Sequence, residues 1–164
     1  MYRIIFYIIF ISFFSLDAIS QTNDESLLIG INYIYHIKFD SASVIFSDYI
    51  KKNPDDPSGY FFDALLAWWK INLNKSDESN DELFFDKAGK VIQICDKLID
   101  KNEKDSRAIF FKGGILGYRG LLKSLRDSWL KAAEDGKEAL NLLEYATELE
   151  PNNKDAFFGI GIYN

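Results

Sequence analysis

The feature that most constrains this sequence is an ordered series of small, aromatic and helix-breaking residues between positions 29 and 54. Its members are Gly30, Tyr33, Ala42, Phe46, Tyr49 and Pro54. Apolar residues at three- and four-residue spacings on both sides of a turn near residues 38–40 predict two amphipathic helices, and Pro54 ends the second. The small residues Gly30 and Ala42 allow the two helices to approach closely, because larger side chains there would push them apart.

The spacing that follows Ala42 recurs near the C-terminus of the sequence. The residues there are Ala139, Leu143, Ala146 and Pro151. A third copy begins at Ala88, but Asp100 stands where the proline is expected, so this copy is degenerate. The position of Gly30 recurs 34 residues later at Ala64. A fixed period of this kind is the sequence signature of a helical-repeat architecture.

In order and period, these residues resemble tetratricopeptide repeat proteins over residues 24–164. The resemblance implies an all-α fold in which antiparallel helix pairs stack as a right-handed α-solenoid, in one domain that spans residues 21–164. The expected units cover about residues 24–56, 57–104 and 105–153, with the start of a further helix at 154–164. The first helix of the second unit is predicted from about Pro57, which suits the first position of a helix, and a polar, acidic loop between Asn72 and Glu82 lengthens this unit.

Four glycines lie in the fifth predicted helix, which begins near Ser106 and precedes a sixth helix predicted from about Asp127. They are Gly113, Gly114, Gly117 and Gly120. Each costs a helix about 1 kcal/mol relative to alanine. Gly113, Gly117 and Gly120 share one face, so we expect close contact with another helix there. A phosphate-binding glycine loop is the functional alternative, but no predicted strand precedes these residues and their spacing differs from that motif.

Residues 1–20 have the three regions of a secretory signal peptide: an early arginine, an apolar run over residues 4–14, and small residues at positions 18 and 20. The run is short for a bilayer span. An uncleaved N-terminal anchor is the alternative, which is less favoured because polar residues interrupt the end of the run. We therefore expect a mature protein that begins near Gln21, has no stable membrane span and functions in the periplasm or outside the cell.

Composition excludes several classes of function. The net charge of -6 argues against nucleic acid or anionic lipid as the main partner. The single cysteine, Cys95, excludes an internal disulfide, and its apolar helical surroundings predict a core position. His36 is also alone, and the acidic loop lacks the central glycine of a calcium-binding loop. We expect no metal, no cofactor and no catalytic residue, although close pairs of carboxylates stay possible.

In the family that the chain resembles, the first helix of each pair lines a concave groove. The candidate partner-binding residues at the corresponding positions are Tyr35, Phe61, Trp68, Trp69, Arg107, Phe110 and Tyr118. Such an aromatic set predicts binding of an extended peptide or apolar segment by burial more than by charge. The alternative role is packing between repeats. It is favoured for Phe61 and Phe110 and stays open for Trp68, Trp69 and Tyr118.

The expected function is that of a non-catalytic scaffold of the cell envelope, which binds a protein or peptide partner. Two alternatives stay open. One is a ligand-binding accessory subunit of an envelope transport system, for which we would expect a closed ring of repeats around a polar cavity. The other is a docking arm of a longer protein with a further C-terminal domain. An open face lined by aromatic residues favours the peptide partner.

Overall fold

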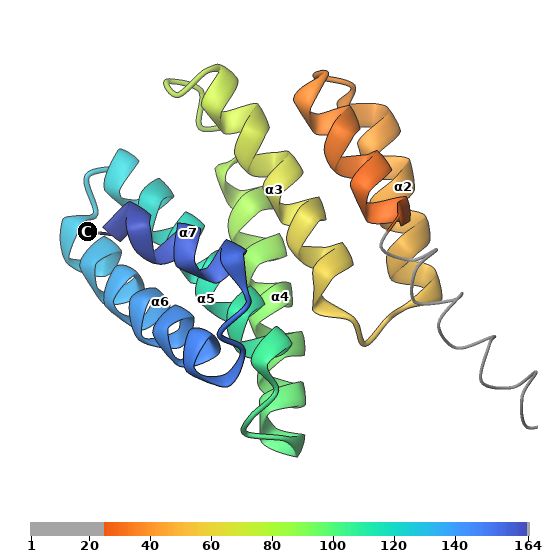
Figure 1. Ribbon diagram of the computed structural model, residues 1–164. Coiled ribbons are helices and arrows are strands. Elements are labelled where there is room, and N and C mark those ends of the chain that lie inside the picture. Colours follow the sequence, from red (N-terminus) through yellow and green to blue (C-terminus); the bar gives the residue numbers. More distant parts are fainter. Residues whose placement is uncertain (1–24, 164) are drawn as a thin grey trace, which may run out of the picture.

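The computed structural model describes residues 25–163, and the regular structure in this part of the chain is entirely helical (Figure 1). A first helix covers residues 25–35, and it is followed by α2 (Phe39–Lys52), α3 (Pro57–Leu73), α4 (Asp81–Lys101), α5 (Ser106–Leu125), α6 (Trp129–Leu149) and α7 (Lys154–Tyr163). The all-α fold class is confirmed. The predicted signal peptide, residues 1–20, lies outside the described residues. Among those that are described, no helix combines the length and apolar character needed to cross a membrane.

Aspartates placed just before α3 and α5 explain where these two helices begin. The side chain of Asp56 accepts a hydrogen bond from the backbone N–H of Ser58 at 2.9 Å, and that of Asp105 accepts one from Ala108, also at 2.9 Å. A capping side chain of this kind satisfies a backbone donor that the first helical turn leaves unpaired. Pro57 is the first residue of α3, where its missing N–H costs nothing.

Ile37 and Asp127 end the first helix and α5 in the same way, in the left-handed conformation with φ of 57°. In each turn, the backbone N–H of the next residue donates to the carbonyl five residues back, at 2.9 and 2.8 Å. This turn closes a helix C-terminus by satisfying its last carbonyls. The sixth helix was predicted to start at about Asp127. It starts instead at Trp129, because a residue with positive φ cannot continue an α-helix.

The segment between α3 and α4 is a polar loop, as predicted, but shorter than residues 72–82, because α3 continues to Leu73 and α4 begins at Asp81. Arg126, just after α5, holds this loop. Its guanidinium donates to the carboxylate of Asp81 and to the backbone carbonyl of Lys75 at 2.7 Å. A single arginine thus connects the start of α4, the loop and the end of α5.

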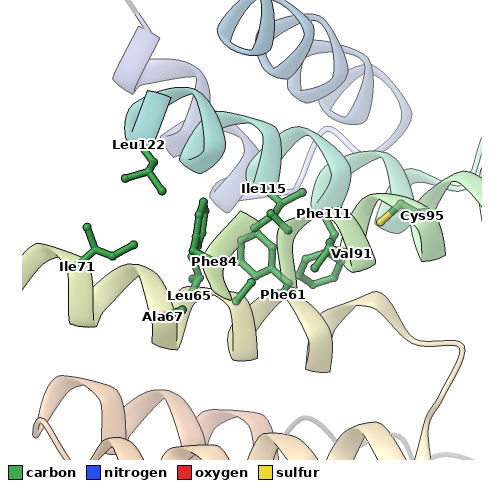
Figure 2. Close-up of a cluster of buried hydrophobic side chains, with 13 residues drawn as sticks. Phe61, Leu65, Ala67, Ile71, Phe84, Val91, Cys95, Phe111, Ile115 and Leu122 are labelled. Carbon is green, nitrogen blue, oxygen red and sulfur yellow. The ribbon is translucent and has the colours of Figure 1, made fainter. Parts of the chain in front are cut away.

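Each helix packs against its neighbours in the sequence, and α3, α5 and α7 also contact one another in series (Figure 1). Two clusters of buried side chains lie between them. The smaller cluster joins the first helix and α2 to Leu66 of α3, and the larger joins α3, α4 and α5 around Phe61, Phe84 and Phe111 (Figure 2). Phe62 packs against both clusters. The core therefore extends along the row of helices.

Small residues allow close approach within the helix pairs. A Cβ atom added at Gly30 would overlap the ring of Phe46 in α2. One added at Gly113 would lie 3.2 Å from the backbone oxygen of Ala139 in α6, and one added at Gly120 would lie 3.1 Å from that of Ala132. The predicted close contact is thus confirmed at Gly113 and Gly120. Gly114 points elsewhere, toward the ring of Phe61 in α3.

Candidate functional site

The seven residues predicted to bind a partner come from the first helix, α3 and α5, and they differ in exposure. Tyr35 is 72% exposed and Trp69 is 40% exposed. Phe61 is buried, with 7% exposure. The others are Trp68, Phe110 and Tyr118, which are half-buried, and Arg107, which is exposed but paired within the protein.

The exposed rings of Tyr35 and Trp69 lie side by side across the first helix and α3. Their centroids are 6.3 Å apart and their planes meet at 64°, which is an edge-to-face contact. The neighbouring Trp68 turns toward the interior and packs on Phe84 of α4 at 5.9 Å and on Tyr118 of α5 at 5.6 Å. The consecutive residues Trp69 and Trp68 therefore belong to two ring pairs: Trp69 pairs with Tyr35 at the exposed side, and Trp68 pairs with Tyr118 in a half-buried position.

Tyr118 and Tyr35, which are 83 positions apart in the sequence, contact the consecutive residues Trp68 and Trp69, respectively. Burial raises the pKa of the Tyr118 hydroxyl, and a negative charge on Tyr35 would raise it further. The ring contacts join four aromatic side chains from three helices into one cluster. We call this cluster the aromatic face, and it consists of Tyr35, Trp68, Trp69 and Tyr118.

The polar atoms of the aromatic face have no hydrogen-bond partner in the part of the chain that the structure describes. Over residues 25–163, the indole N–H groups of the two tryptophans and the hydroxyls of the two tyrosines make no hydrogen bond to another side chain or to the backbone. No buried polar side-chain atom of a buried or half-buried residue in this range lacks a partner. The indole nitrogen of Trp68 and the hydroxyl of Tyr118, both on half-buried residues, are therefore not fully buried.

Phe61 and Phe110 both take part in the buried packing of α3, α4 and α5. The ring of Phe61 lies 6.2 Å from that of Tyr118 and 5.1 Å from that of Phe111, in space that Gly114 leaves open. Phe61 therefore packs α3 against α5, which was the favoured alternative for it. Phe110 is half-buried, packs against the same cluster and contacts its neighbour Phe111 at 5.1 Å.

Arg107 belongs to a polar network that joins α2, α3 and α5. Its Nη2 donates to Asp56 Oδ2 at 3.0 Å and to Ser58 Oγ at 3.2 Å, and the hydroxyl of Tyr49 donates to Asp56 at 2.7 Å. Burial alone would raise the pKa of Asp56, but the hydrogen bonds from Ser58 and Tyr49 and the charge of Arg107 lower it. Arg107 therefore already serves an interaction within the protein.

Sequence reasoning missed this network. An aspartate two residues before a serine, at the start of a predicted helix, is a capping signal that could have identified Asp56. The pairing with Arg107, which is 51 positions away, had no signal in a single sequence.

The single cysteine and the single histidine of the sequence lie in different surroundings. Cys95 is fully buried, and burial raises the pKa of its thiol to about 12, so the thiolate is scarce. His36 is exposed, and its ring Nδ1 lies 2.8 Å from the carbonyl oxygen of Asn32. Within residues 25–163, no group of three His, Cys, Asp or Glu side chains could hold a metal ion.

Comparison of the sequence with protein-family models finds no match, and comparison with curated proteins finds none either.

Proposed function

We propose that this chain is a non-catalytic interaction scaffold, which binds a segment of a partner protein on the aromatic face. The observation that carries the proposal is the aromatic face itself. Ring contacts join four tryptophan and tyrosine side chains from three helices into one cluster, and two of them, Tyr35 and Trp69, are exposed. Tryptophan and tyrosine are the residues in which binding energy is most often concentrated at protein interfaces.

The inner side of the aromatic face favours binding because it is held in place before a partner arrives. Trp68 and Tyr118 contact each other and rest on the core residues Phe84 and Phe61. Rings fixed in this way lose little conformational freedom when a ligand covers them, so more of the burial energy appears as affinity. Tyr35 and Trp69 supply the accessible area.

We further propose that the helices form a right-handed solenoid of the tetratricopeptide type and that the protein acts in the periplasm or outside the cell. The first part rests on the glycine contacts of Gly30 and Gly113, which recur at equivalent positions of two helix pairs, and on the serial contacts of α3, α5 and α7. The second rests on the signal-peptide pattern of residues 1–20.

A site-specific photo-crosslinker tests the scaffold function in cells that produce the full chain. The reagent is introduced at position 35 on the aromatic face and, as a matched control, at position 129, because Trp129 is a similarly exposed aromatic residue, at 64%, on a different helix. We expect one defined crosslinked protein from position 35 and none of that mass from position 129.

The same crosslink is then measured with Trp69→Ala and with Trp129→Ala in the background. Loss of the crosslink with the first variant and retention with the second supports the proposal, provided that circular dichroism shows an unchanged helix content. Equal crosslinking from both positions, or a crosslink that survives Trp69→Ala in a folded protein, would contradict it.

A further inference from the structure

The first helix and α2, residues 25–52, have a hydrophobic cluster that is separate from the main one. Its buried members come from these two helices and from one position of α3: Leu27, Ile34, Ala42, Phe46, Tyr49 and Leu66. All buried members of the larger cluster lie in α3, α4 and α5. Within the described residues, α2 contacts α3 and none of the helices α4 to α7. The packing of α2 on the rest of the protein therefore depends on α3.

One carboxylate, that of Asp56 just before α3, connects α2 to α5. Its Oδ2 accepts a hydrogen bond from the hydroxyl of Tyr49 in α2 at 2.7 Å and another from Nη2 of Arg107 in α5 at 3.0 Å. Its Oδ1 accepts from the backbone N–H and the hydroxyl of Ser58 in α3, at 2.9 and 2.7 Å. We call these four residues the Asp56 latch. It joins two helices that do not pack on each other.

The Asp56 latch is ionic. Burial favours the neutral acid, but the hydrogen bonds and the charge of Arg107 outweigh it and lower the pKa of Asp56, so the carboxylate is charged at neutral pH. Hydrogen bonds to a charged group are stronger than those between neutral groups. Asp55 and Asp105 line the same surface depression as Asp56 and Arg107. They are the other carboxylates available to Arg107, so a test must remove the latch from both of its ends.

The division of the core predicts where the protein opens. Proteins open locally in cooperative units, which often coincide with supersecondary motifs that have few contacts to their surroundings. Residues 25–52 form such a motif. They contribute no buried member to the larger cluster, so that cluster stays intact when they move. In contrast, α5 contacts α3, α4, α6 and α7, and its opening would disrupt most of the structure.

We propose that residues 25–52 are an opening unit, which detaches from α3 while α3 to α7 stay folded, and that the Asp56 latch keeps this unit closed. Opening uncovers Leu66 of α3, which is 4% exposed in the closed state, and separates Tyr35 from Trp69. The Asp56 latch thus controls access to one side of α3. This device exists whether or not a partner binds the aromatic face.

Native-state hydrogen exchange of the mature chain, measured by mass spectrometry of its peptides, tests the opening unit. Asp56→Asn removes the charge and keeps a side chain that can cap α3. Asp63→Asn is the matched control. It is the same change on α3, at a side chain that is 22% exposed against 23% for Asp56, and it breaks an ion pair with Lys87 of α4 instead.

We expect Asp56→Asn to raise exchange rates in residues 27–52 by at least about tenfold and to leave those of α5 and α6 unchanged. Asp63→Asn should leave residues 27–52 unchanged. Arg107→Gln breaks the Asp56 latch from its other end and should act in the same way as Asp56→Asn. The double variant should exchange within about twofold of the faster single variant, because both changes remove one interaction.

Three results would overturn the opening unit or its latch. The first is an equal rise in exchange over residues 25–163, which would show that the chain opens as a whole. The second is unchanged exchange of residues 27–52 in both Asp56→Asn and Arg107→Gln. The third is a rise with Asp63→Asn as large as that with Asp56→Asn. Photo-crosslinking from position 35 is a separate measurement, so the scaffold function stands or falls independently of these results.

Discussion

The helix pairs α3–α4 and α5–α6 are both antiparallel, but different groups fill the space between their helices. In α5–α6, Gly113 and Gly120 bring the helices so close that an added Cβ would lie 3.1–3.2 Å from a backbone oxygen. In α3–α4, aromatic rings lie between the helices. The ring centroids of Trp68 and Phe84 are 5.9 Å apart, and Figure 2 shows Phe84 within the buried cluster. The pair α5–α6 is therefore fixed by backbone contact, whereas the pair α3–α4 is held by ring burial.

The two pairs also differ in how charge is used. The helix α5 contains no acidic residue, and acids on neighbouring helices pair with its cations. Asp135 of α6, whose side chain is 6% exposed, receives both Arg119 and Lys123 at 2.7 Å. The comparison shows a division of roles. Close backbone contact and buried charge fix α5–α6, while the ring-filled pair α3–α4 leaves Trp68 half-buried and Trp69 exposed.

The largest effect should come from the ring-filled pair. Phe84 is fully buried, and we expect Phe84→Ala to lower the free energy of unfolding by about 3–5 kcal/mol, because it removes a large buried ring and leaves a cavity under Trp68. Denaturant unfolding measures this loss. Its neighbour Leu83, which is 45% exposed, provides the control, and Leu83→Ala should have a much smaller effect. Similar losses for the two variants would show that ring burial does not hold this pair.

The next effect should come from the backbone contact of α5–α6. Gly120→Val places a branched side chain against the backbone oxygen of Ala132, and a backbone atom cannot rotate away as the end of a side chain can. We therefore expect the free energy of unfolding to fall by about 3 kcal/mol. Gly89→Val in α4 is the matched control, because an added Cβ at Gly89 meets nothing within 4 Å. Thermal unfolding of both variants gives the measurement. A stable Gly120→Val protein would disprove the close packing.

A smaller effect is expected from the buried charge. Burial alone would raise the pKa of Asp135, but hydrogen bonds from Arg119 and Lys123 and their charges lower it. The stabilisation that this lowered pKa provides is therefore fully present at pH values above the unfolded-state pKa of about 3.9. It is lost as pH falls through the folded-state pKa. We expect Asp135→Asn to cost about 2 kcal/mol at neutral pH.

Because asparagine does not titrate, the gap in unfolding free energy between the wild-type protein and Asp135→Asn should shrink as pH falls below about 4. Chemical denaturation at a series of pH values measures that gap. A gap that stays constant down to pH 3 would mean that the pKa of Asp135 is the same in the folded and unfolded states.

The smallest effect should be a gain. Gly89→Ala adds a methyl group into open space on an exposed helix position, so we expect the free energy of unfolding to rise by about 0.8–1 kcal/mol from helix propensity alone. The same change at Gly113 meets Leu143 and the backbone of Ala139 at 3.1–3.2 Å, and it should give less than this gain. The melting temperatures of the two variants measure this difference. An equal rise in melting temperature for both would show that the contact of α5 with α6 at Gly113 leaves room for a methyl group.

Most helix positions were predictable from the sequence because periodicity and end signals act locally. The predicted start at Pro57, the end before Pro54 and the close contact at Gly113 all depend on residues within one helix pair, and the structure agrees with them. The start at Asp127 was wrong by two residues, because nothing in the sequence distinguished an aspartate in a left-handed turn from one in the first helical turn.

The candidate site was predictable only in part. The resemblance to tetratricopeptide repeats predicted that Tyr35, Trp69 and Tyr118 line one side, but exposure depends on what neighbouring helices cover. Phe61 became buried because Gly114 of α5 leaves room for its ring, and Arg107 was engaged by Asp56, 51 positions away. Contacts between residues so distant in the chain need the three-dimensional arrangement.

The serial packing of the helices also has a kinetic consequence. Every pair of helices in contact is adjacent in sequence or separated by one other helix, within the part of the chain that the structure describes. Short loops between contacting segments are closed at low entropic cost, and proteins dominated by such local contacts fold fastest. Helix pairs of this chain can therefore form one after another as synthesis proceeds, before the contact of Arg107 with Asp56 connects α5 to the start of α3.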